Sequence, residues 1–71
     1  MKVKVHYRGQ LKELEFEKQS VRAVDVLKAL GLSSEYAFVV RGDEILDEKE
    51  IIKDGEELRV INAISGGLEY L

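Results

Sequence analysis

Polar and apolar residues alternate over much of the chain, as they do in strands that bury one face. Apolar residues occupy every second position over residues 3–7 and again at Leu14 and Phe16, and a turn signal at Arg8-Gly9 lies between the two runs. A glycine between alternating runs is typical of a hairpin. Residues 2–7 and 10–17 are therefore predicted to form two antiparallel strands.

Between residues 20 and 31 the spacing of apolar residues lengthens to three and four. The apolar positions are Ala23, Val26, Leu27 and Leu30. This spacing is that of the buried stripe of an amphipathic helix. Ser20 or Arg22 would cap the start of the helix, and Gly31 is typical of a left-handed residue at its end. A helix this short needs a sheet to pack against.

Strand-forming residues return in the second half of the chain. The predicted strands are residues 36–41, 44–47 and 58–63. Residues 48–53 are ambiguous, because Ile51 and Ile52 should both be buried, and a helical turn is one way to bury them. Asp54-Gly55 is a strong turn signal before the last strand.

The predicted order is strand, strand, helix, strand, strand, strand, which indicates an α+β fold with one helix packed across a mixed sheet of four or five strands. If the first and last strands lie side by side at the centre, the chain leaves at one end of the sheet. The residues expected in the core are Val3, Val5, Leu14, Phe16, Val26, Leu27, Leu30, Phe38, Val40, Leu58 and Val60.

The amino-acid composition excludes several kinds of functional site. The 71 residues suffice for one domain, and the absence of cysteine excludes disulfides and a thiolate nucleophile. His6 is the single histidine, so no histidine-based metal site or base–nucleophile pair is expected. The N-terminus lacks the apolar block of a signal peptide, and no run approaches the ~20 apolar residues of a membrane span. We therefore expect a cytoplasmic protein without a membrane partner.

Charge is unevenly distributed. The net charge of −3 argues against nucleic acid as the main partner. Residues 1–31 hold seven Lys or Arg against four Asp or Glu, whereas residues 43–57 hold eight acidic residues against two lysines. The acidic stretch is either a solvated face or a docking surface for a basic partner. The high charge and the scarcity of Asn, Gln and Cys match the bias of proteins from hot environments.

Gly66-Gly67 stands four residues before the last residue of the chain. Two glycines add nothing to a core and cost backbone entropy to order. Without a Cβ, however, the backbone can pass through a channel too narrow for side chains. The pair is either an ordinary flexible terminus or the reactive end of a carrier.

The order of elements, together with several motifs, resembles the ubiquitin-like β-grasp sulfur carriers of molybdopterin and thiamin synthesis, the MoaD and ThiS families, and the related archaeal ubiquitin-like modifiers. The resemblance covers residues 1–67. Its most specific parts are residues 25–32, the Arg41-Gly42 turn, and Asp54-Gly55 leading to residues 64–67.

The resemblance implies a carrier, not an enzyme: a monomeric β-grasp domain over residues 1–64 with a flexible tail over residues 65–71. Gly67 would supply the carboxylate that an adenylating (E1-like) enzyme activates with ATP and a sulfurtransferase converts to a thiocarboxylate. Gly66 would be its slim neighbour. The family ends on the second glycine, so a processing protease would have to remove Leu68 to Leu71. No bound cofactor or metal is implied.

The resemblance also implies that apolar residues beside the tail dock on the activating enzyme. With Leu58 and Val60 inward, Arg59 and Ile61 face outward on the last strand. With Phe38 and Val40 taken as inward, Ala37 and Val39 face outward. The expected partner surface is Val39, Arg59, Ile61, Ala63, Ile64 and Ser65.

Three fates remain open for such a chain. A thiocarboxylate at Gly67 would serve molybdopterin synthesis, thiamin synthesis or tRNA thiolation. Attack by a lysine amine on the activated Gly67 would instead give an isopeptide, as in a protein modifier. If Leu68 to Leu71 are permanent, the domain is a non-reactive binding module.

Overall fold

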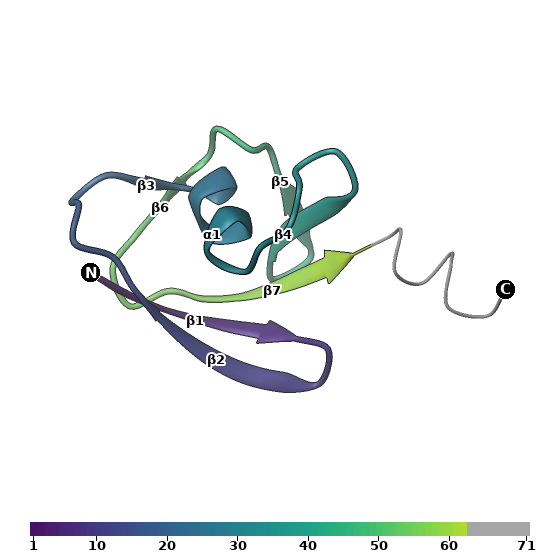
Figure 1. Ribbon diagram of the computed structural model, residues 1–71, viewed down its shortest axis with the longest axis horizontal. Coiled ribbons are helices and arrows are strands. Elements are labelled where there is room, and N and C mark those ends of the chain that lie inside the picture. Colours follow the sequence, from purple (N-terminus) through teal and green to yellow (C-terminus); the bar gives the residue numbers. More distant parts are fainter. Residues whose placement is uncertain (63–71) are drawn as a thin grey trace, which may run out of the picture.

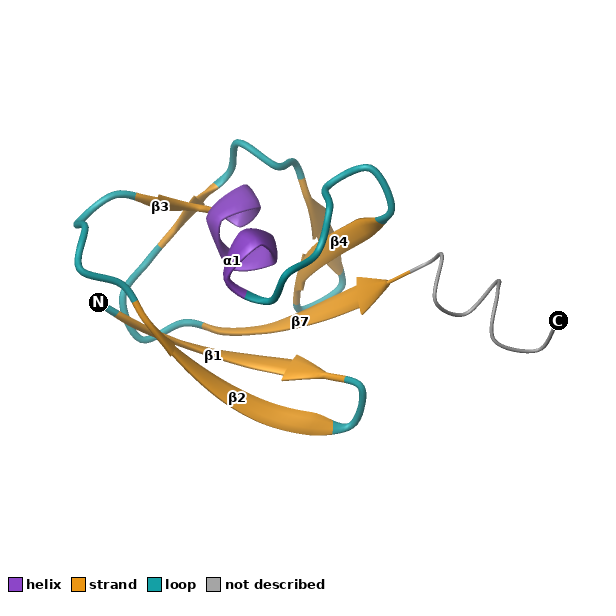
Figure 2. Cartoon of the chain, viewed as in Figure 1, coloured by secondary structure: helices purple, strands orange, loops and turns teal. Residues whose placement is uncertain are grey.

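Five strands form a twisted sheet, and one helix packs across one side of it (Figure 1). The computed structural model describes residues 1–62. Its elements are β1 (Lys2–Tyr7), β2 (Gln10–Glu15), β3 (Val21–Arg22), α1 (Ala23–Ala29), β4 (Ala37–Arg41), β5 (Glu44–Leu46), β6 (Ile51–Ile52) and β7 (Glu57–Asn62). The α+β prediction is confirmed, and Figure 2 shows the single helix among the strands and the loops that connect them.

The strand order in the main sheet is β2-β1-β7-β4-β5. The first and last strands pair in parallel at its centre, with Val5 opposite Leu58. All the other neighbours in this sheet pair antiparallel, so the sheet is mixed, as expected. Strand β7 ends at Asn62, at the edge of the described chain, and it points toward one end of the sheet (Figure 1).

Residues 48–53 do not form the helical turn that was considered for them. Ile51 and Ile52 form β6, which pairs antiparallel with β3 in a separate two-stranded sheet. Ile52 is 2% exposed, but Ile51 lies on the other face of the strand and is 53% exposed. The expectation that both isoleucines are buried was therefore wrong, because neighbouring residues of a strand point to opposite faces.

One side-chain contact from within α1 and two backbone contacts from residues 48–50 hold the start of the helix. The Asp25 carboxylate accepts the N–H of Arg22 at 2.8 Å, and the carbonyls of Glu50 and Glu48 accept the N–H groups of Ala23 (2.9 Å) and Val24 (3.0 Å). These contacts satisfy donors that a helix leaves unpaired in its first turn. The helix ends before Gly31, which has a φ of 76°, as its sequence position predicted.

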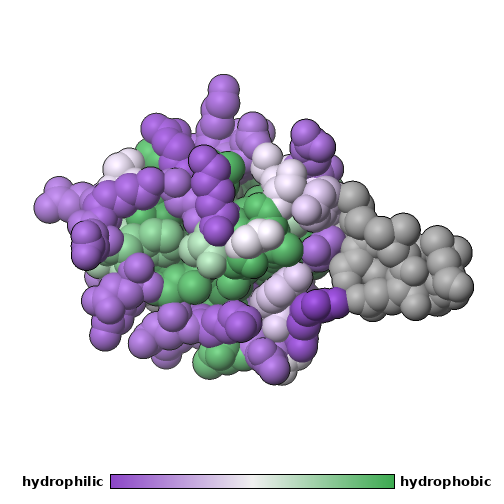
Figure 3. Space-filling model, viewed as in Figure 1, coloured by the Kyte–Doolittle hydropathy of each residue, from purple (hydrophilic) through white to green (hydrophobic). Residues whose placement is uncertain are grey.

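The core fills the space between the sheet and α1. Its buried members are Val3, Val5, Val21, Ala23, Val26, Leu27, Ala37, Val39, Leu46, Ile52, Leu58 and Val60. Leu14, Phe16 and Leu30, which were expected to be buried, are only half-buried and pack against this cluster. In Figure 3 apolar residues accordingly form a band across the middle of the molecule, bordered by polar side chains.

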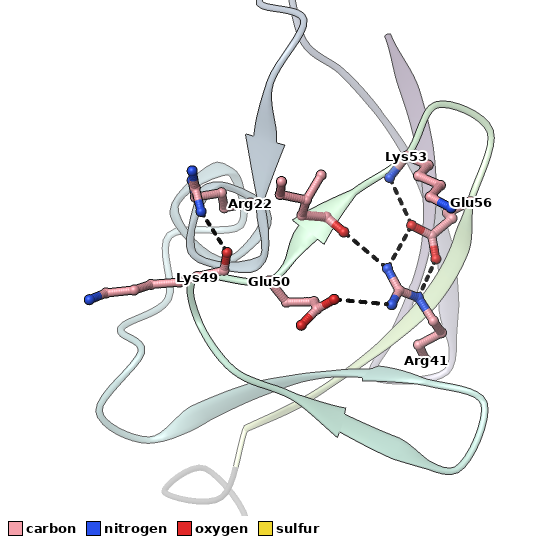
Figure 4. A network of polar contacts seen from close by, with 7 residues as sticks. Arg22, Arg41, Lys49, Glu50, Lys53 and Glu56 are labelled. Atoms are coloured by element: carbon pink, nitrogen blue, oxygen red, sulfur yellow. Dashed lines mark hydrogen bonds and ion pairs between the residues drawn. The ribbon is translucent and has the colours of Figure 1, made fainter.

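A cluster of charged groups joins the end of β4 to the turn before β7 (Figure 4). The Arg41 guanidinium holds the Glu56 carboxylate through two contacts, Nε–Oε1 at 2.5 Å and Nη2–Oε2 at 3.0 Å. Arg41 also donates to the carbonyl of Ile51 (3.1 Å), and Glu56 accepts the N–H of Lys53 (2.8 Å). Glu50 lies 3.7 Å from the same guanidinium. The cluster ties β4, β6 and the β6–β7 turn together.

The Arg41–Glu56 contact predicts a dependence of stability on pH. The hydrogen bond from Arg41 lowers the pKa of Glu56 from its usual 4.5. The ionised carboxylate therefore stabilises the fold above the unfolded-state pKa, and this contribution is lost as pH falls through the lower folded-state pKa. We expect Glu56→Gln to reduce the free energy of unfolding by ~1–2 kcal/mol at neutral pH.

Urea unfolding of both proteins between pH 7 and about pH 2 measures this difference. The gap between wild type and Glu56→Gln should close at the acidic end, because both side chains are then uncharged. A gap that stays constant at every pH would assign the effect to the shape of the side chain and not to its charge.

Candidate partner-binding surface

The face of the sheet opposite α1, here called the helix-free face, carries the exposed residues of the last strand. Along β7 exposed and buried residues alternate, so Glu57, Arg59 and Ile61 lie on this face while Leu58 and Val60 point toward the helix. This confirms the outward placement of Arg59 and Ile61. Ile61 is 47% exposed, one residue before the end of the described chain.

Strand β4 has the opposite phase from the one expected. Phe38 pairs with Ile61 and is 39% exposed on the helix-free face. Val39 pairs with Val60 and is 1% exposed beneath α1, and Ala37 is likewise buried. The placement of Val39 in the partner surface was therefore wrong. Four consecutive apolar residues give no alternation from which to read the phase, and pairing with β7 sets it instead.

Ile45 extends the exposed surface toward the edge of the sheet, and the nearly buried Val40 lies between Ile45 and Phe38. Val40 pairs with both Arg59 and Ile45, so it lies on the helix-free face, although it is only 3% exposed. Ile45, on the edge strand β5, is 64% exposed. Phe38, Val40, Ile45 and Ile61, called the apolar patch from here on, form one contiguous set of cross-strand neighbours. Exposed apolar residues gathered in this way mark interaction sites more often than isolated ones do.

Polar groups border the apolar patch on the side where β7 begins. His6 Nε2 lies 2.5 Å from Glu57 Oε2, and this hydrogen bond lowers the pKa of Glu57. Arg59 stands between His6 and Val40 in the pairing across the sheet and donates to the carbonyl of Gly42 at 3.3 Å. The helix-free face is thus polar where β7 begins and apolar where β7 ends.

Sequence reasoning identified Ile61 and Arg59 but missed the other members of the apolar patch, Phe38, Val40 and Ile45. Phe38 could have been identified only as the residue that pairs with Ile61, and this pairing is known only once the register between β4 and β7 is known. Ala63, Ile64, Ser65, Gly66 and Gly67 lie outside the described residues, as does the division expected between residues 64 and 65.

Within residues 1–62, no three His, Cys, Asp or Glu side chains are grouped so as to hold a metal ion. In the same part of the chain no helix has the length and apolar character needed to cross a membrane.

Solved structures with the same arrangement define the class of fold. A crystal structure of ATBAG1 in complex with HSP70 superposes on 99% of this chain with a TM-score of 0.74 and 16% identity, using 45% of that chain. The UBL domain of Plasmodium falciparum Dsk2 superposes on 87% of this chain with a TM-score of 0.69 and 15% identity, using 96% of that chain. The fold is therefore the ubiquitin-like β-grasp.

Sequence comparison then gives the family. Residues 5–67 match the model of the ThiS family. The chain therefore belongs to the ThiS family, which confirms the resemblance to small β-grasp sulfur carriers. The match ends on the second glycine of the Gly66-Gly67 pair.

Two relatives agree with this assignment. Sulfur carrier protein TtuB of Thermus thermophilus is 42% identical over 43 residues, which is 61% of this chain and 66% of that protein, just under two thirds of its length. An uncharacterized protein of Archaeoglobus fulgidus is 35% identical over 68 residues, which is 94% of this chain and the full length of that protein.

The phase of β4 can be tested with two neighbouring substitutions. Val39→Asp places an unpaired carboxylate beneath α1, which should cost more than ~3 kcal/mol and leave this small domain largely unfolded. Phe38→Asp places the same carboxylate on the helix-free face in contact with water, and should cost less than ~2 kcal/mol. Urea unfolding followed by circular dichroism ranks the two variants. Greater damage from Phe38→Asp would mean that the assigned phase is wrong.

Proposed function

We propose that this chain is a ubiquitin-like sulfur carrier whose reactive group is the carboxylate of Gly67 after removal of residues 68–71. The observation that carries the proposal is the extent of the family match, which ends at Gly67 and excludes the last four residues. The name of the relative TtuB, a sulfur carrier protein, supports the same role.

The chemistry requires a free carboxylate at Gly67. A carboxylate oxygen attacks the α-phosphate of ATP, pyrophosphate leaves, and an acyl-adenylate forms. A sulfide equivalent from a sulfurtransferase then attacks the carbonyl carbon, AMP leaves, and the product is a thiocarboxylate. In the uncleaved chain this carbon is part of the Gly67–Leu68 amide, which offers no such oxygen, so a processing protease is a necessary partner.

The chain's own contribution is recognition and delivery. The apolar patch lies at the end of β7, next to the point where the chain continues to residue 63. An adenylating enzyme that covers Phe38 and Ile61 is thereby positioned to receive the glycines, which fit a channel too narrow for side chains. In this role the chain binds no cofactor itself. ATP is bound by the activating enzyme, and we place the reaction in the cytoplasm.

The fate of the activated carboxylate distinguishes the pathways. Sulfur from the thiocarboxylate would pass to a precursor of molybdopterin or thiamin, or to a tRNA base. A lysine amine attacking the same acyl-adenylate would form an isopeptide, so protein modification shares the first step with sulfur transfer. Adenylation of Gly67 is the step common to all of these fates.

Ile61→Asp tests the docking role of the apolar patch. Ile61 is 47% exposed, so the variant should fold, but a carboxylate buried against an apolar partner surface loses hydration without compensation. We expect affinity for the adenylating enzyme to fall by at least about tenfold, the equivalent of ~1.4 kcal/mol. Titration calorimetry with the adenylating enzyme from the same cell measures it.

Ile51→Asp is the matched control, because Ile51 is 53% exposed on the separate two-stranded sheet. It should bind as the wild type does. Equal weakening by both substitutions would mean that added negative charge and not the apolar patch sets the affinity.

Cleavage after Gly67 is the second test of this function. With ATP and the adenylating enzyme, a chain ending at Gly67 should support exchange of labelled pyrophosphate into ATP, whereas the chain ending at Leu71 should not. A third chain ending at Gly66 controls for tail length. Pyrophosphate exchange by the uncleaved chain, or no exchange by the chain ending at Gly67, would contradict the carrier function and favour a non-reactive binding module.

A further inference from the structure

A groove runs along the side of the domain between α1 and the β4–β5 hairpin, with a volume of about 630 Å³. Its floor consists of nearly buried apolar residues of the core, among them Leu27, Ala37 and Leu46. Strand β5 pairs with β4 only from Val39 onward, so the groove extends beside the first two residues of β4. Because its floor is part of the packed core, the groove is preformed.

The rim of the groove is acidic. Glu35, Asp47 and Glu48 line it, and among the described lining residues there is no Lys or Arg. No ion pair involves Glu35 or Glu48 within residues 1–62, whereas Arg41, Glu56 and Asp25 elsewhere in that range are paired. The carboxylates of Glu35 and Glu48 are therefore available to cations from another molecule.

Backbone contacts hold the acidic side of the groove in place. The carbonyl of Glu48 accepts the N–H of Val24 in the first turn of α1 at 3.0 Å. The Asp47 carboxylate accepts the N–H of Lys49 at 3.0 Å, and the carbonyl of Asp47 accepts the N–H of Glu50 at 2.9 Å. A ligand that binds here meets a wall already fixed to the helix, so little entropy is lost in ordering it.

We propose that this groove binds a segment of a partner protein in which one or two apolar side chains are flanked by Lys or Arg. The apolar side chains would lie on Leu27, Ala37 and Leu46, and the cations would reach Glu35 and Glu48. Charge complementarity is the reason for this choice, since an apolar floor alone would accept any apolar segment. The volume lies within the range of ~300–1,000 Å³ found for ligand pockets in general.

This surface goes beyond the proposed docking of an adenylating enzyme. Phe38 and Ile45 form both the outer wall of the groove and part of the apolar patch. The acidic residues, however, belong to the groove alone. A test that uses the acidic residues therefore separates the two surfaces, and it requires neither a free Gly67 nor an activating enzyme.

The experiment is a selection from a displayed peptide library on the full chain, with two central positions restricted to Leu, Ile, Val and Phe and the flanks randomised. We expect Lys and Arg to be enriched in the flanks over Asp and Glu. The most enriched peptide, titrated into 15N-labelled protein, should shift the amide signals of Ala37, Leu46 and Glu48 more than those of Lys4 and Glu57.

Paired charge reversals test whether the peptide binds in the groove. Glu35→Lys with Glu48→Lys should raise the dissociation constant about tenfold or more, since each reversal turns an attraction into a repulsion. Glu13→Lys with Glu15→Lys makes the same change in net charge on β2, away from the groove, and should change the constant less than about threefold. All four side chains are exposed, so the variants should remain folded.

Several results would overturn the proposal. These are acidic or uncharged flanks in the enriched peptides, signals that shift mainly on the helix-free face, equal weakening by both pairs of reversals, or no enrichment. If deletion of Leu68 to Leu71 shifts the groove signals without any peptide, the chain's own tail is the occupant. If the signals shift with protein concentration alone, the occupant is a second copy.

Discussion

The parallel pairing of β1 with β7 at the centre of the sheet is the contact on which the other features of the domain depend. It places the first and last strands of the described chain side by side, with Val5 beside Leu58 under the helix. Once β7 is fixed, its antiparallel pairing with β4 decides which residues of β4 meet α1 and which meet solvent. A shift of one residue in this register would exchange Val39 for Phe38 in the core and dismantle the apolar patch.

The same pairing explains why charged and apolar residues of the described chain lie at opposite ends of β7. Charged clusters such as Arg41 with Glu56 hold the turns at the end of the sheet from which β7 begins, and no charged side chain is buried within residues 1–62. The other end of β7 is bordered by Phe38 and Ile61. A partner that recognises these residues therefore contacts the end of β7, the last element of the described chain, as the proposed carrier role requires.

The residue pattern within a short segment predicted those elements that such a segment determines by itself. The spacing of Val26, Leu27 and Leu30 and the glycine at position 31 were sufficient to locate α1, because a helix carries its own period and end signal. The β3–β6 pairing was missed, since two-residue strands have no period and their partners lie far apart in sequence. The faces of β4 were assigned wrongly for a related reason: residues 37–40 are all apolar, and only tertiary pairing distinguishes them. The Arg41–Glu56 contact likewise joins residues that no sequence motif connects.

We propose that the reactive group of the protein is the carboxyl group of Gly67, delivered by a β-grasp domain of the ThiS family. Intact-mass spectrometry of the protein isolated from its own cells, without an added tag, tests it most directly. We expect a chain that ends at Gly67, with a fraction heavier by the replacement of one oxygen by sulfur. A population that retains Leu71 throughout and carries no sulfur at the terminus would contradict it.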